Sequence, residues 1–180
     1  MEDRVLSKSG AVFSVCRKYR YALWRMWDDD KPFVMIIGLN PSTADEKVND
    51  PTIIRCISFA RSWGYGGVCV VNLFGFRATA PSELKAYHAP IGRYNDEWVR
   101  EIAKDSALKV AAWGNHGKFL NRSDDFLLSL DKLHCIQMNK SGEPSHPLYL
   151  KGELKPVPMT PSQQTNQFSE SIIAGHQQHK

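Results

Sequence analysis

The sequence predicts a single α/β domain: a three-layer α/β/α sandwich with a four-stranded parallel sheet, plus an N-terminal β-hairpin. Unbroken apolar runs such as residues 33–37 alternate along the chain with segments whose apolar residues recur every three or four positions. The 180 residues, 42% of them hydrophobic, are enough for one ordinary domain with a real core. We expect this domain over residues 1–158 and a flexible polar tail, rich in Gln and Ser, over residues 159–180.

The first predicted element is a β-hairpin at residues 11–27. Ala11, Phe13 and Val15 alternate with other residues, and an aromatic-rich run follows them. The acidic residues 28–30 form the turn that closes it. The apolar run at residues 33–37 then predicts a central strand covered on both faces.

The first helix is predicted to begin at Asp50, an N-cap residue that is followed by Pro51 in the first turn. Gly64 is expected to end this helix. Its expected buried face consists of Ile53, Ile54, Ile57 and Ala60.

The same alternation continues toward the C-terminus. The remaining strands are predicted at residues 67–71, 108–113 and 133–138. The remaining helices are predicted as a short piece from residue 80, one capped by Asn95 or Asp96, and one over residues 119–130. Strands that alternate with helices in this way form parallel sheets.

The composition excludes several classes of protein. The net charge is only +4, from 23 basic and 19 acidic residues. Residues 1–27 hold this excess, which suits either an anionic partner or a solvated strand surface. No apolar run reaches the roughly 18 residues of a membrane span, and the N-terminus does not resemble a signal peptide. We therefore expect a cytoplasmic monomer with no membrane contact.

The cysteines, histidines and glycines suggest no bound cofactor. The four cysteines lack C-x-x-C spacing and lie in apolar runs, so we expect buried free thiols. The six histidines show no metal-ligand spacing. Neither the dinucleotide-binding G-x-G-x-x-G loop nor the G-x-x-x-x-G-K phosphate loop is present in a suitable position. The prediction is no metal and no cofactor.

Polar side chains follow the predicted parallel strands. Asn40 follows the first strand, Asn72 ends the second, and His146 lies in the loop after the fourth. Because ligands bind at the carboxyl ends of strands in open α/β sheets, we expect these groups to converge. Amide and imidazole groups can hydrogen-bond a planar heterocycle, and Phe74 or Trp113 could stack on it. Each residue alone is equally typical of a turn, a cap or a surface loop.

Four motifs in order resemble the uracil-DNA glycosylase superfamily over roughly residues 33–150. They are Gly38-Leu39-Asn40-Pro41, the Val-Val-Asn-Leu of residues 70–73, the strand ending in Trp-Gly at residues 110–114, and Ser145-His146-Pro147-Leu148. The mismatch-specific and single-strand-selective branches are the most similar. The segments GLNPSTAD and HPLYL resemble even more closely those of an uncharacterised bacterial and phage domain family. We take this family as a branch of the same superfamily.

The resemblance implies a glycosylase that hydrolyses the N-glycosidic bond of a modified or mismatched pyrimidine flipped out of DNA. It implies that Asn40 orients the attacking water and that His146 donates to the departing base. It further implies that Asn72 reads the base edge and Leu148 fills the gap in the DNA. The other expected binding residues are Gly38, Leu39, Pro41, Ser42, Phe74 and Arg77.

Two positions qualify the resemblance. Ser42 is smaller than the residue of some relatives and would leave room for a substituent on the base. Asp45 is a possible general base or ribose ligand, and equally a turn acceptor. Backbone N–H groups at residues 141–142 could hold a phosphate.

Two other functions stay open. The chain could be a non-catalytic module that binds a nucleobase or nucleic acid, or an enzyme that acts on free nucleosides or nucleotides. The expected partners are accordingly DNA, a nucleobase or a nucleotide.

Overall fold

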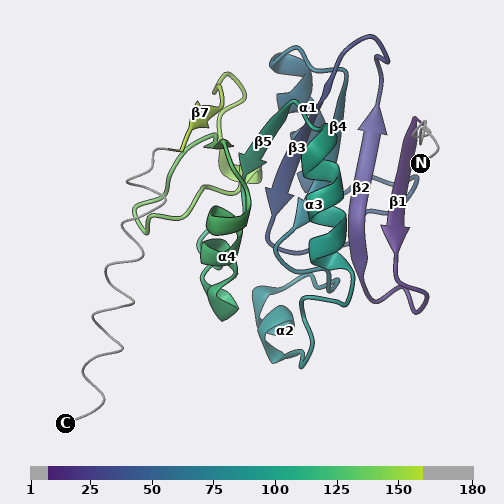
Figure 1. Ribbon diagram of the computed structural model, residues 1–180, viewed down its shortest axis with the longest axis vertical. Coiled ribbons are helices and arrows are strands. Elements are labelled where there is room, and N and C mark those ends of the chain that lie inside the picture. The colour runs from purple at the N-terminus through teal and green to yellow at the C-terminus, as the bar shows by residue number, and fades with distance from the viewer. Residues whose placement is uncertain (1–7, 160–180) are drawn as a thin grey trace.

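The computed structural model describes residues 8–159, which form a mixed α/β fold around one seven-stranded sheet (Figure 1). The strand order is β1-β2-β4-β3-β5-β6-β7. The strands are β1 (Ser9–Phe13), β2 (Arg20–Met26), β3 (Phe33–Gly38), β4 (Gly67–Asn72), β5 (Leu108–Ala111), β6 (Leu133–Cys135) and β7 (Val157–Pro158). The helices are α1 (Pro51–Ser62), α2 (Pro81–Ala86), α3 (Asn95–Asp105) and α4 (Arg122–Ser129), with short 3₁₀ turns at Phe119–Asn121 and Pro147–Tyr149.

The sheet is larger than the predicted four-stranded parallel sheet. Strands β4, β3, β5 and β6 do run parallel to one another, but β2 adds antiparallel to β4 and β7 adds antiparallel to β6. The predicted hairpin is formed by β1 and β2, and through the pairing of β2 with β4 it extends the sheet. The sequence did not reveal this pairing because periodicity identifies a strand without identifying its neighbour.

Helices cover both faces of the sheet. Side chains of β3 and β4 alternate between two apolar clusters, as successive residues of a strand must. Val34 and Ile36 pack with α1 on one face. Met35 and Ile37 pack on the other face with side chains of α2, α3 and α4. The layered arrangement follows from these strands being apolar at every position.

The helix starts correct two details of the prediction. The Asp50 side chain caps α1 by accepting the Ile53 N–H at 2.9 Å, as predicted, but Ile54 is 57% exposed and lies outside the buried face. Tyr94, not Asn95 or Asp96, is the N-cap of α3. Asn95 has no exposed surface and bonds to the sheet instead.

The topology brings distant segments to one edge. Gly38 and Asn72 are register partners at the carboxyl ends of the parallel strands β3 and β4. Met159 is buried in the core, so the polar tail does not begin at this residue as predicted. The rest of the expected tail, residues 160–180, lies outside the described residues.

Candidate functional site

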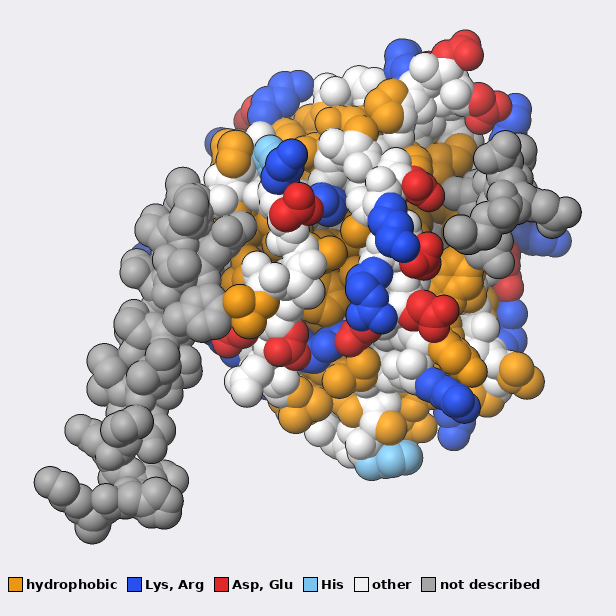
Figure 2. Space-filling view, in the orientation of Figure 1, with side chains coloured by type: hydrophobic (Ala, Val, Ile, Leu, Met, Phe, Trp, Pro, Cys, Tyr) orange, Lys and Arg blue, Asp and Glu red, His pale blue; other side chains and the backbone are white. Residues whose placement is uncertain are grey.

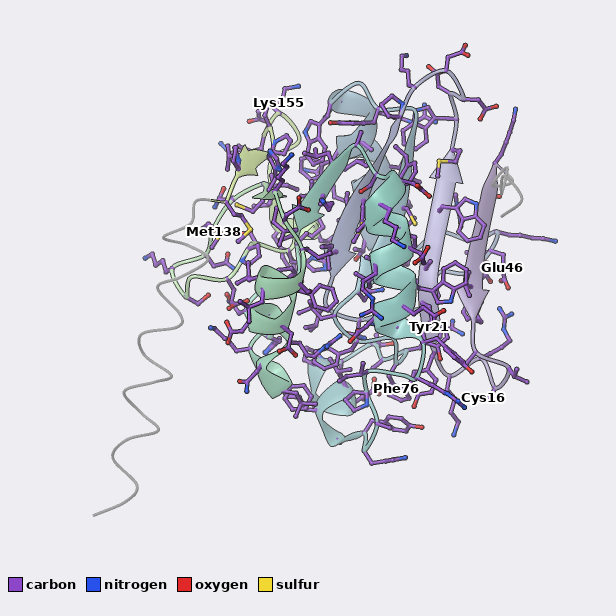
Figure 3. All side chains as sticks on the ribbon, in the orientation of Figure 1. Cys16, Tyr21, Glu46, Phe76, Met138 and Lys155 are labelled. Atoms are coloured by element: carbon purple, nitrogen blue, oxygen red, sulfur yellow. The ribbon has the colours of Figure 1, made fainter. Side chains whose placement is uncertain are left out.

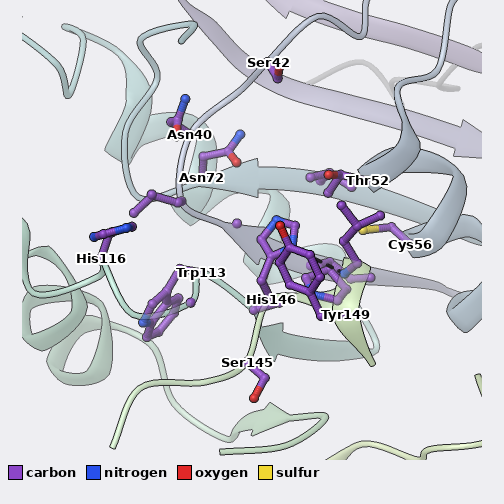
Figure 4. Close-up of a pocket in the computed structure, with 18 of the residues that line it drawn as sticks. Asn40, Ser42, Thr52, Cys56, Asn72, Trp113, His116, Ser145, His146 and Tyr149 are labelled. Atoms are coloured by element: carbon purple, nitrogen blue, oxygen red, sulfur yellow. Dashed lines mark hydrogen bonds between the residues drawn. The ribbon is translucent and has the colours of Figure 1, made fainter. Parts of the chain in front are cut away.

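A cavity of about 650 Å³ opens where the parallel strands end (Figure 4). Its wall comes from the segments that follow β3, β4, β5 and β6 and from the first turn of α1. The structure therefore brings most of the predicted site residues together. Those that line the cavity are Gly38, Leu39, Asn40, Ser42, Asn72, His146 and Leu148.

Asn72 is the most enclosed polar group of this wall. Only 3% of the residue is exposed, and its amide Nδ2 is buried without a hydrogen-bond partner. A buried donor left unpaired costs roughly 1–3 kcal/mol. A side chain that lines a cavity and carries this cost is suited to meet a ligand acceptor.

Asn95 and Arg122 hold the backbone that carries Asn72. The Asn95 Nδ2 donates to the carbonyl oxygens of Asn72 at 3.0 Å and Leu73 at 3.3 Å. Arg122, also buried, donates to the Leu73 oxygen through Nε and Nη2 and pairs with Asp96. Sequence reasoning missed both residues, because a polar residue inside a helix gives no sign of which strand it will meet.

Asn40 is held in one orientation. Its Nδ2 donates to the carbonyl oxygens of Pro41 at 3.0 Å and Ala78 at 2.7 Å. These two bonds use both hydrogens of the amide nitrogen, which leaves the Oδ1 atom as the group available to a ligand or water. Asn40 therefore offers a fixed acceptor, in the position where the sequence predicted a water-orienting residue.

His146 has a defined tautomer when it is neutral. Its Nδ1 accepts the backbone N–H of Leu148 at 3.3 Å, which places the ring proton on Nε2. Burial lowers the pKa of the imidazole from its usual value, and this favours the neutral form. The ring therefore presents a neutral N–H donor. Gly114 lies beside His146 and has a φ of +75°, a conformation that favours glycine, although a Cβ there would make only ordinary contact with the His146 Cβ at 3.5 Å.

Four of the predicted site residues do not line the cavity. Pro41 is buried in the loop, and Phe74 has no exposed surface and packs against Phe119 at 5.5 Å between ring centroids. Phe74 therefore cannot stack on a ligand. The Asp45 carboxylate accepts the N–H groups of Lys47 at 2.8 Å and Val48 at 2.7 Å. These bonds hold the pKa of Asp45 below its usual value, so the structure gives it the role of a turn acceptor.

The fourth of these residues, Arg77, belongs to a set of arginines that fixes the loop after β3. Arg77 donates to the carbonyl oxygens of Ser42 at 3.2 Å and Thr43 at 3.4 Å. Arg20 donates to the oxygen of Ala44 and Arg25 to that of Asp45, each at 2.8 Å. Four consecutive carbonyl groups thus each accept from a guanidinium. We call Arg20, Arg25 and Arg77 the arginine clamp. Nothing in the sequence pattern pointed to it, because the arginines are distant from the loop in the chain.

A buried polar network supports the opposite wall. The indole Nε1 of Trp113 donates to the Glu143 carboxylate at 2.6 Å, and the Ser123 hydroxyl reaches the same carboxylate at 3.3 Å. Both Trp113 and Glu143 are almost fully buried. The bond joins the segment after β5 to the loop that carries His146. Trp113 lines the cavity, and of the two predicted stacking residues it alone does so.

The basic side chains do not form a groove over the face shown in Figure 2. Acidic and basic side chains are interspersed over α3 on this face. At the suggested phosphate loop, the N–H of Gly142 donates to the Asn139 oxygen and that of Glu143 to the Ser141 hydroxyl. Of the two N–H groups suggested as phosphate donors, that of Gly142 is therefore already used within the turn.

A second hollow of about 530 Å³ lies beside the hairpin and is mostly lined by aromatic and small side chains. Tyr21 and Phe76 lie near Cys16 at this end of the molecule (Figure 3). Two of the rings that line this hollow, those of Tyr19 and Tyr21, stack on one another at 6.2 Å between centroids. We assign no ligand to this hollow.

No group of three or more His, Cys, Asp or Glu side chains in residues 8–159 is placed to hold a metal ion. No helix among them has the length and apolar character needed to cross a membrane.

Comparison with known families gives one match. Residues 20–148 match the family described as "Protein of unknown function (DUF1643)". The chain belongs to the DUF1643 family. The matched span runs from β2 to the 3₁₀ turn after His146, so it contains Asn40, Asn72 and His146. No curated protein and no solved structure matches the chain. The description of DUF1643 assigns no activity, and the resemblance to the uracil-DNA glycosylase superfamily stays a prediction.

Proposed function

We propose that the cavity recognises a pyrimidine-type nucleobase and that the protein hydrolyses the N-glycosidic bond of the nucleotide that carries it. The first substrate to test is a modified or mismatched base flipped out of DNA. The proposal includes a uracil-DNA glycosylase-like arrangement of the fold, which accords with the parallel strands that end at the cavity.

The observation that carries the proposal is the unpaired amide nitrogen of Asn72. It is a buried donor in a cavity that also offers the Nε2–H of His146 as a second donor. Two neutral donors suit a ring with two carbonyl oxygens, as in uracil-type bases. Trp113 lines the opposite wall, but only 1% of the residue is exposed, so it bounds the cavity and does not offer a stacking face.

The chemistry divides between two residues in this proposal. The Oδ1 of Asn40 accepts a hydrogen bond from the attacking water and fixes its direction, without being basic enough to remove a full proton. The water oxygen bonds to C1′ of the sugar while the bond between C1′ and the base nitrogen breaks with both electrons on the base, and the proton released by the water ends on the departing base. The Nε2–H of neutral His146 then stabilises the oxygen on which negative charge develops. Donors already in place make this stabilisation effective.

Oligonucleotides that contain uracil, hypoxanthine or 5-hydroxymethyluracil test the proposal. Incubation followed by alkali breaks the strand only where a base has been removed. Asn40→Ala and His146→Ala should abolish the breaks, while His134→Ala, a substitution on β6 outside the cavity lining, should leave them unchanged. Salt-dependent binding of DNA without breaks would favour a non-catalytic module instead.

One observation favours a second candidate, hydrolysis of a free nucleoside or nucleotide. The cavity wall also contains Arg20, Asp50 and Thr52, polar side chains beyond those needed to read a base. A flipped base alone would leave this part of the cavity without hydrogen-bonding partners. Release of free base from nucleosides, with every oligonucleotide left intact, would select this candidate.

A further inference from the structure

The cavity has a polar compartment next to the proposed base site. Its side chains are Arg20, Ser42, Asp50 and Thr52, which all line the cavity. Figure 4 shows Ser42 beyond Asn40, on the side away from Trp113. A lone pyrimidine ring is much smaller than the cavity, whose 650 Å³ falls in the range of roughly 300–1,000 Å³ typical of sites for whole small molecules.

Arg20 is the strongest sign of a ligand in this compartment. The residue is 2% exposed, and its Nε is buried with no hydrogen-bond partner. Its Nη1 donates to the Ala44 oxygen at 2.8 Å. Burial lowers the pKa of the guanidinium only to about 10, so the group is charged at neutral pH. A buried cation with unused donors is costly unless a ligand supplies acceptors.

Asp50 balances this charge. Its two carboxylate oxygens accept the N–H groups of Ile53 at 2.9 Å and Ala44 at 3.3 Å, and each oxygen can accept again. Ala44 therefore links the two ionic side chains, because its oxygen binds Arg20 and its N–H binds Asp50. Among residues 8–159, neither Arg20 nor Asp50 forms an ion pair within 4.0 Å.

The paired charges determine which groups fit. A positive and a negative side chain in one wall cancel to first order, so the compartment does not attract a phosphate or a carboxylate strongly. It offers donors from Arg20 and acceptors from Asp50 together. A hydroxyl group uses both, because it accepts one hydrogen bond and donates another. Acidic side chains bind ribose hydroxyls in this way in other nucleotide sites.

We propose that this compartment holds the ribose of a free nucleoside, with the 2′-hydroxyl between Arg20 and Asp50. The inference rests on the second candidate of the proposed function, a free nucleoside, since a ribose lies past Asn40 only if the base lies between Asn72 and His146. The hydroxyl of Thr52, in the first turn of α1, is a further partner for the sugar. The site consequently prefers ribonucleosides to deoxyribonucleosides, a distinction made through the 2′-hydroxyl.

Calorimetric titration with uracil, uridine and 2′-deoxyuridine tests the proposal. Uridine should bind the wild-type protein roughly tenfold more tightly than 2′-deoxyuridine, the effect expected for one hydroxyl bonded to charged groups. Arg20→Met should bring the ratio close to one without changing the affinity for uracil. Thr52→Val should reduce the ratio as well, and it is the safer variant for folding because Thr52 is only half-buried.

Arg25→Met is the matched control. Arg25 is buried and holds the same loop through the Asp45 oxygen, but it does not line the cavity. The ribose preference should survive this substitution. A loss of the preference in Arg25→Met equal to that in Arg20→Met would mean that Arg20 only holds the loop, and the ribose compartment would be wrong.

The outcomes separate the two proposals. If uridine binds no more tightly than 2′-deoxyuridine, the ribose compartment is wrong. The base site still stands in that case, provided that uracil binds and that Asn72→Ala abolishes this binding. Absence of binding by all three compounds, with every oligonucleotide substrate also intact, overturns both.

Discussion

Replacement of Gly38 by Ala tests the base site with a single added methyl group. The Cβ of an alanine at this position would lie 2.7 Å from the Oδ1 of Asn72, where ordinary contacts begin at 3.4 Å. The Asn72 amide must therefore move by about 0.7 Å, the difference of the two distances. Displacement of a positioning group by about 1 Å can cost 10²-fold in activity, so we expect a loss of roughly 10- to 100-fold in base binding or turnover.

The assay compares uracil affinity and thermal unfolding in wild-type and Gly38→Ala protein. The matched control is Gly152→Ala, whose Cβ would meet only the flexible end of Arg55 at 3.4 Å. Binding should fall in the first variant and not in the second, with both folded. A folded Gly38→Ala protein that binds the ring as well as the wild type would refute the role given to Asn72.

Three further predictions concern neighbouring groups. Because the pKa of His146 is lowered in the folded protein, the unfolded chain takes up the proton first as the pH falls. The stability present above about pH 6.5 is therefore lost as the pH falls toward the pKa of His146 in the folded state. Denaturant unfolding across a pH series should show this loss in the wild type and a flatter dependence in His146→Gln. Trp113→Phe removes the 2.6 Å donor to Glu143 and should cost roughly 1–3 kcal/mol of unfolding free energy. Cys16 is exposed, which corrects the expectation of four buried thiols, so a thiol reagent at pH 8 should label it quickly and should label Cys56, whose pKa burial raises to about 12, only on unfolding. Equal rates would contradict the buried placement of Cys56.

Local signals in the sequence were enough for most of the elements. The apolar run before Gly38 and the Asp50-Pro51 start of α1 depend only on neighbouring residues, and the structure has both. The strand neighbours of β2 and β7 depend on contacts across the sheet. The periodicity of a single sequence does not show those contacts, and the predicted sheet of four strands therefore had too few strands.

The site residues likewise include some that the sequence could place and others that it could not. Asn40, Asn72 and His146 could be placed at one edge because parallel strands end on the same side of a sheet. Arg20 could not, because it begins an antiparallel strand of the predicted hairpin, and the sequence did not show which strand that hairpin would pair with. Asp45 looked like a chemical group, and only the backbone of its own turn shows that its oxygens are occupied.

The arginine clamp also makes one rim of the cavity rigid. The rim from Ser42 to Asp45 cannot lift away from the molecule without stripping charge-assisted hydrogen bonds from four carbonyl groups. The facing rim is a single 3₁₀ turn whose Tyr149 is 84% exposed. Arg55 holds this turn in the same manner, through the carbonyl oxygens of Pro147 and Leu150, so guanidinium groups brace the cavity mouth from both sides and a ligand would meet a preformed opening.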